Sequence, residues 1–80
     1  MRPAAIGVLD LREVSAPRTS PLVSLFFGSL APGASFILVS DQNIEPFYHQ
    51  LDVEQEGRLL WEDLEEGPGR WIAQIVKPLD

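Results

Sequence analysis

No charged side chain occurs between Thr19 and Ser40, and this stretch limits the choice of fold more than any other feature of the chain. Within it, Ser20-Pro21 is a helix-start signal, because a hydroxyl caps free N–H groups and proline suits the first helical position. Ala31-Pro32-Gly33 ends that helix near Ser29 or Leu30. The apolar run Ser35–Ser40 then has the length of a buried strand. The stretch therefore predicts a helix followed directly by a central strand.

The rest of the chain supplies one strand before this unit and a helix and two strands after it. Asn43 is expected to cap the second helix, on which apolar residues recur at helical spacing and form one stripe. The predicted elements outside the uncharged stretch are a strand over 6–11, a helix over 44–55, and strands over 59–64 and 70–76, the last two joined by a glycine-rich turn at 65–69. The order β-α-β-α-β-β predicts an α/β (α+β) two-layer sandwich, with a mixed four-stranded sheet and both helices on one face.

Size and charge limit what such a chain can bind. Eighty residues allow one domain, expected over residues 7–77 with tails at 1–6 and 78–80. Net charge is −6, because residues 1–40 carry three basic and two acidic residues, whereas residues 41–80 carry three basic and ten acidic. This surface repels nucleic acids and anionic membranes. No apolar run reaches the ~20 residues of a membrane span, so we expect a cytoplasmic protein.

Residues able to perform catalysis or bind a metal are few. The chain has no cysteine, which excludes a disulfide, a thiol redox centre and a thiolate zinc site. His49 is the only histidine and is expected on the surface of the second helix. Neighbours Glu62 and Asp63 point to opposite faces of a strand, and Glu65-Glu66 falls in the predicted turn. We therefore expect no catalytic residues, no metal and no cofactor, which favours a protein that is not an enzyme.

Three segments together resemble a known family. They are Asp10-Leu11-Arg12, the stretch Pro46-Phe47-Tyr48-His49-Gln50-Leu51, and the hairpin Trp61-Glu62-Asp63-Leu64-Glu65-Glu66-Gly67-Pro68-Gly69-Arg70-Trp71. Over residues 7–76 the chain is similar to an uncharacterised bacterial family of the TusA/SirA-like superfamily. This resemblance implies the TusA/SirA-like fold and a redox or respiratory setting. The Cys-Pro pair of the sulfur carriers reads Ala16-Pro17 here, and the family histidine reads Gln42, so the resemblance comes without the sulfur-carrier chemistry.

The first candidate site binds a small anion or another small ligand, as in a regulatory domain. Arg12, Arg18, Thr19 and Ser20 are expected where the first strand ends and the first helix begins. Ligands tend to bind at this place in open α/β sheets, and a helix N-terminus offers free N–H groups to an anion. The competing interpretation is that Arg12 pairs with Asp10 or Glu13 and that Arg18 is solvated.

The second candidate site is an interface on the first helix. Its apolar residues cover an arc of about 200°, more than one sheet can bury, which leaves Leu25 on one edge and Phe27 on the other exposed. The small residues Ser24, Gly28 and Ser29 would allow a close approach. This favours a non-catalytic accessory domain that binds a protein partner or forms a homodimer. Alternatively, the second helix and the loops cover the excess. Trp61 and Trp71 are expected to pack within the hairpin.

Overall fold

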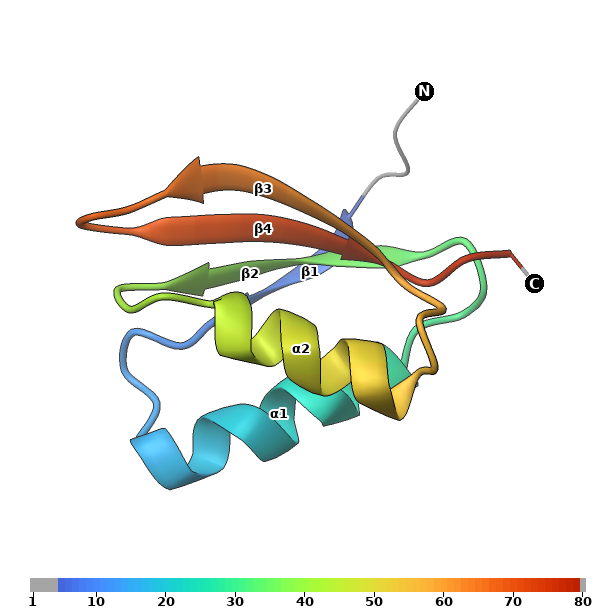
Figure 1. Cartoon of the computed structure of the whole chain (residues 1–80), viewed down its shortest axis with the longest axis horizontal. Coiled ribbons are helices and arrows are strands. Elements are labelled where there is room, and N and C mark those ends of the chain that lie inside the picture. Colours follow the sequence, from blue (N-terminus) through green and yellow to red (C-terminus); the bar gives the residue numbers. More distant parts are fainter. Residues whose placement is uncertain (1–4, 80) are drawn as a thin grey trace.

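The four strands form one mixed sheet (Figure 1). In the computed structural model, which describes residues 5–79, the strands are β1 (Ala5–Asp10), β2 (Ser35–Ser40), β3 (Leu60–Glu66) and β4 (Trp71–Val76). Their spatial order is β1-β2-β4-β3, with β1 parallel to β2 and β4 antiparallel to both of its neighbours. The parallel pair requires a crossover, which the first helix provides, whereas β3 and β4 are joined by a tight turn.

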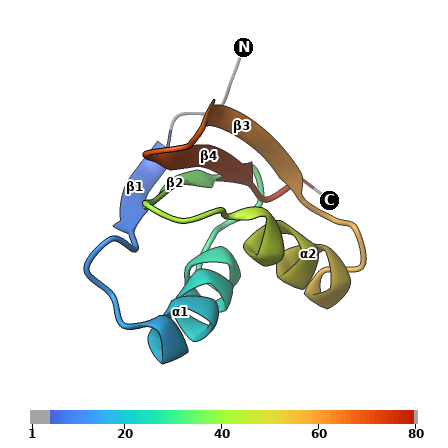
Figure 2. The same ribbon diagram turned by 60° about the vertical axis from the view of Figure 1, so that its left-hand side comes forward.

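Both helices, α1 (Ala16–Gly28) and α2 (Glu45–Glu54), lie on the same face of this sheet (Figures 1 and 2). The predicted two-layer sandwich with the order β-α-β-α-β-β is therefore confirmed. No helix within residues 5–79 is long and apolar enough to cross a membrane.

The core fills the space between the two layers. On the α1 side it contains Val23 and Phe27, and on the α2 side Leu51, all essentially without solvent exposure. The central strands β2 and β4 contribute Leu38 and Ile75, which are equally buried. Complete burial of side chains of this size stabilises the fold by about 1.5–3 kcal/mol each. The stripe predicted on α2 therefore faces the sheet, as its spacing indicated.

Helix α1 begins at Ala16, one turn earlier than the predicted start at Ser20. Ser15 and Pro17 carry a start signal of the same type as Ser20 and Pro21, and the earlier of the two is used, with Pro17 in the first turn. Pro21 then lies inside the helix. In consequence Thr19 and Ser20 are not at the free N-terminus of α1, where the sequence had placed them.

Other boundaries shift less. Strand β1 begins at Ala5, which was assigned to the tail, while residues 1–4 and 80 of the predicted tails lie outside the described residues. Asn43 Oδ1 accepts a hydrogen bond from the Glu45 N–H at 2.9 Å, as expected of a cap, although Ile44 occupies the capping position. The largest change is at the hairpin, where Glu65 and Glu66 belong to β3 and not to the turn.

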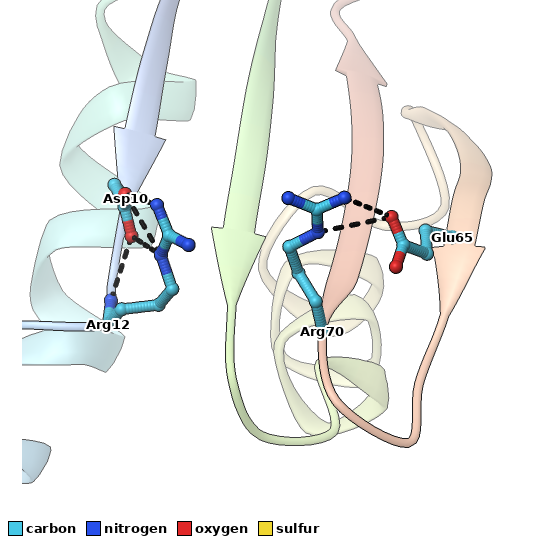
Figure 3. Close-up of polar contacts among 4 residues, drawn as sticks. All are labelled: Asp10, Arg12, Glu65 and Arg70. Carbon is cyan, nitrogen blue, oxygen red and sulfur yellow. Dashed lines mark hydrogen bonds and ion pairs between the residues drawn. The ribbon is translucent and has the colours of Figure 1, made fainter.

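Two ion pairs among the described residues 5–79 are drawn in Figure 3, and both lie on the other face of the sheet. Arg12 binds Asp10 at the end of β1, and Arg70 binds Glu65 across the β3–β4 hairpin with an Nη2–Oε1 distance of 2.9 Å. All four side chains are substantially exposed. Pairs as exposed as these contribute little to stability, because solvent screens the attraction, so the fold depends chiefly on its buried core.

Candidate functional site

The two residues predicted at the edges of α1 have opposite environments. Leu25 is 62% exposed, whereas Phe27 is 1% exposed and belongs to the core. The expectation that Phe27 is an exposed interface residue is therefore wrong. The reason is tertiary: Phe27 packs into the core with Val23, and Lys77 lies over its ring, with Nζ 5.3 Å from the ring centroid and a hydrogen bond donated to the Leu30 carbonyl.

Next to Leu25 lies an apolar groove of about 220 Å³ between α1 and the edge strand β1. Phe26 and Phe36 contact each other in it with tilted rings, whose centroids are 5.6 Å apart and whose planes are at 57°. Gly7 forms its β1 side, and a Cβ there would meet no atom within 4 Å, so the missing side chain leaves the groove open. The remaining lining residues are Leu25, Ser29 and Leu30. The groove could receive an apolar side chain from another surface.

The opposite flank of α1 is closed by hydrogen bonds to α2. Gln50 Nε2 donates to the Ser24 hydroxyl at 2.6 Å, and the Ser20 hydroxyl donates to Gln50 Oε1 at 2.5 Å. Ser24 also donates to Glu54. Ser24 therefore faces α2 and is not available for the approach of another surface, while Ser29 does line the groove. Only one flank of α1 remains free for a partner.

The four predicted anion ligands are not brought together. Arg12 and Thr19 line a polar pocket of about 320 Å³ at the ends of β1 and β2. Arg18 is exposed outside that lining, and Ser20 is occupied by Gln50. The Thr19 hydroxyl donates to the Ala16 carbonyl. The pocket thus holds one arginine, and it also holds the acidic Asp41.

Asp10 further reduces the capacity of Arg12 to bind an anion. Hydrogen bonds from the Arg12 side chain and then from its backbone N–H lower the pKa of Asp10 from 3.8 to about 2. The side-chain hydrogen bonds with Asp10, followed by the attraction of the Asp10 charge, raise the pKa of Arg12 above its ordinary value. Of the two interpretations of Arg12 that the sequence allowed, pairing with Asp10 is the one present.

The polar pocket also contains both positions at which the resemblance implied reactive side chains. Ala16 and Gln42 line it, and neither can supply a thiolate or an imidazole. His49 is exposed on α2, with its ring centroid 5.5 Å from that of Tyr48. Within residues 5–79, no three His, Cys, Asp or Glu side chains are grouped so that they could hold a metal ion.

Sequence reasoning missed a third pocket, of about 450 Å³, between the first turns of α2 and the β3–β4 hairpin. Trp61 and Trp71 pack against the core as predicted, but both also line this pocket together with Tyr48. The other lining residues are Asn43, Ile44, Glu45, Asp63 and Glu66. The signal in the sequence that could have indicated this pocket is the combination of two tryptophans with several carboxylates in one hairpin.

The fold and these sites define a small two-layer α/β domain with an apolar groove, a polar pocket and an aromatic pocket. A model of a protein family described as an uncharacterised conserved protein, DUF2249, matches residues 8–77. The chain therefore belongs to the DUF2249 family. No curated protein and no solved structure matches it.

Proposed function

We propose that this domain is a non-catalytic interaction module that self-associates through α1, with Leu25 of each copy seated in the groove of the other. The observation that carries the proposal is the position of Leu25, a largely exposed leucine at the wall of an open apolar groove. An exposed apolar side chain beside an apolar depression is a typical mark of an interface.

The groove suits a second copy because a protruding residue and a depression lie side by side on one surface. A two-fold axis passing near Leu25 would bring each leucine to the partner's groove, and both contacts would be the same by symmetry. Gly7 and Ser29 at the rim add little bulk, so the backbone of α1 could approach closely. A second copy of this domain is therefore a sufficient partner, and no larger protein is required.

Charge also favours a second copy at this surface. Two chains of net charge −6 repel each other, but the excess of acids lies in residues 41–80 and none lies between Thr19 and Ser40. An interface on α1 therefore joins the uncharged parts of both copies. A domain of 80 residues gains stability from the added burial, since a small core alone is marginal.

Three finer assignments belong to this proposal. One is membership of the TusA/SirA-like superfamily, which the resemblance implies together with this order of elements. A chain without cysteine would serve in that superfamily as an accessory protein and not as a sulfur carrier. The others are the redox or respiratory setting and the cytoplasmic location.

Size-exclusion chromatography with light scattering tests the self-association directly. The native chain should have the mass of a dimer at high micromolar concentration, and Leu25→Glu should have the mass of a monomer, because a charge cannot be buried unpaired in the groove. Val53→Glu is the matched control, since Val53 is 79% exposed on α2 and its replacement adds the same charge elsewhere. A native chain that stays monomeric, or a Val53→Glu chain that dissociates equally, would contradict the proposal.

A second variant blocks the groove without adding charge. Gly7→Leu places a side chain in open space, so the fold should be retained while the groove is filled. We expect this variant to be monomeric with an unchanged circular dichroism spectrum. A Gly7→Leu dimer as stable as the native one would show that the groove is not used.

A further inference from the structure

The aromatic pocket has walls from three elements. Tyr48 of α2 meets Trp61 of β3 edge to face, with ring centroids 5.3 Å apart and planes at 67°. Trp71 of β4 packs on Gly67, where a Cβ would collide with the indole. Both indoles are only partly buried, so aromatic surface remains available inside the pocket.

A β-bulge in β3 determines which carboxylates share this pocket. The pairing shifts between Asp63 and Glu65, so that Asp63 opposes Ala73 and Glu66 opposes Trp71. Residues directly opposite each other project from the same face of a sheet, and Ala73 is a core residue. Asp63 and Glu66 are therefore on the helix side, at positions where a two-layer fold normally places apolar residues. Bulges commonly re-aim side chains beside functional sites.

The same bulge places a carboxylate that has an ion-pair partner on the outer face of the sheet and the pocket carboxylates of β3 on the helix side. Glu65 lies on the outer face and is bound by Arg70. Within residues 5–79, the three pocket carboxylates, those of Glu45, Asp63 and Glu66, form no ion pair with an arginine or lysine. Asp63 only accepts a hydrogen bond from the Trp61 indole N–H, at 2.9 Å. The pocket thus combines aromatic rings with negative charge, and no cationic side chain lines it in the part of the chain that the structure describes.

We propose that this pocket binds an organic cation, an ammonium or guanidinium group held against the faces of Trp61 and Trp71 with the carboxylates around it. The faces of aromatic rings are negative and attract cations, and tryptophan does so most strongly. Asp63 and Glu66 add charge attraction and accept hydrogen bonds from N–H donors. The volume of about 450 Å³ falls in the range of small-ligand pockets.

A bare metal ion fits the pocket less well than an organic cation. The carboxylates do not form a cluster that could coordinate a metal within the described chain, and an ion with a tightly held water shell gains little from aromatic walls. The pocket is separate from the α1 groove, with which it shares no residue, so this inference does not rest on self-association.

Tryptophan fluorescence provides a direct assay, because the chain contains two tryptophans and both line the pocket. Tetramethylammonium chloride and arginine methyl ester are titrated at constant ionic strength, with calorimetry as a second readout. We expect saturable binding of at least one cation and none of 2,2-dimethylpropanol, a water-soluble neutral molecule close in size to tetramethylammonium. No saturable signal from either cation in either readout, or equal binding of the neutral molecule, would overturn the proposal.

Matched variants separate a specific site from general attraction to an acidic protein. Asp63→Asn/Glu66→Gln should weaken cation binding about tenfold, the factor that corresponds to 1.4 kcal/mol. Both side chains are exposed, so the fold should be unaffected. Glu13→Gln/Glu56→Gln changes net charge equally at exposed positions outside the pocket and should bind as the native chain does. Equal weakening in both double variants would overturn the proposal.

The probes also distinguish the source of the cation. Binding of acetyl-Gly-Arg-Gly-amide as tight as that of arginine methyl ester indicates a side chain presented by a protein. Binding of the free cation alone indicates a small amine or guanidine. Both results support the same chemistry in the pocket, whereas failure of all three cations would exclude it.

Discussion

Asp10 and Arg12 form a two-pronged ion pair at the end of β1, with Arg12 Nε 3.0 Å from Asp10 Oδ1 and Nη2 2.7 Å from Oδ2 (Figure 3). The Arg12 backbone N–H binds the same carboxylate. One carboxylate thus fixes both the side chain and the backbone where the strand leads into the loop before α1. This arrangement explains why Arg12 is not free to bind an anion.

The pair predicts a specific response to acid. Because the pKa of Asp10 is lowered from 3.8 to about 2, its contribution to stability is complete above about pH 4 and is lost as the pH falls toward 2. Melting temperatures of the native chain and Asp10→Asn should therefore differ slightly at neutral pH and converge near pH 2. A difference that persists at pH 2 would contradict this assignment. The effect is small because the pair is exposed.

The alternative hypothesis, that Arg12 and Arg18 bind a small anion, can be tested separately. Since Asp10 occupies Arg12 and Arg18 lies outside the polar pocket, we expect phosphate and sulfate to raise the melting temperature equally in the native chain and in Arg12→Ala/Arg18→Ala. Thermal denaturation over a series of anion concentrations measures this. A saturable shift that is lost in the double variant, but kept in an Arg58→Ala control, would support the anion site.

The contact between the helices depends on Gln50. Its amide makes hydrogen bonds with the Ser20 hydroxyl, the Ser20 carbonyl and the Ser24 hydroxyl. Gln50→Ala should lower the free energy of unfolding by about 1–2 kcal/mol, since the half-buried Ser24 hydroxyl and the exposed Ser20 groups lose their partner. Urea denaturation measures the loss. Gln42→Ala, at an exposed site, should change it by less than about 0.5 kcal/mol; equal effects would show that the contact is weak.

The hairpin turn depends on the absence of a side chain at Gly67. Its φ is +51° and the Trp71 indole occupies the space of a Cβ. Gly67→Ala should therefore cost about 1–3 kcal/mol of unfolding free energy and change the tryptophan emission. Gly69→Ala is the control, because a Cβ there meets nothing within 4 Å. Equal stability of the two variants in urea would contradict this interpretation of the turn.

Local patterns were sufficient for most of the fold. The helical spacing of Ile44 and Leu51 and the apolar run at Ser35–Ser40 identified the buried faces correctly. The predicted start of α1 was wrong because the chain has two helix-start signals about one turn apart, Ser15 with Pro17 and Ser20 with Pro21. Local sequence alone does not show which of the two begins the helix. The prediction that both Leu25 and Phe27 are exposed was correct for Leu25 and wrong for Phe27, which belongs to the core and is covered by Lys77, far away in the chain.

Sequence patterns were enough to predict the order of the elements, and composition was enough to establish the absence of charge from Thr19 to Ser40 and the acidic character of residues 41–80. Each is local, because periodicity and composition act within a single element. Tertiary packing was needed to show that Gly7 leaves a groove open beside Leu25, and that a bulge places Glu66 opposite Trp71 and Glu65 next to Arg70. Those outcomes depend on strand register and on packing between distant segments, which neither periodicity nor composition encodes.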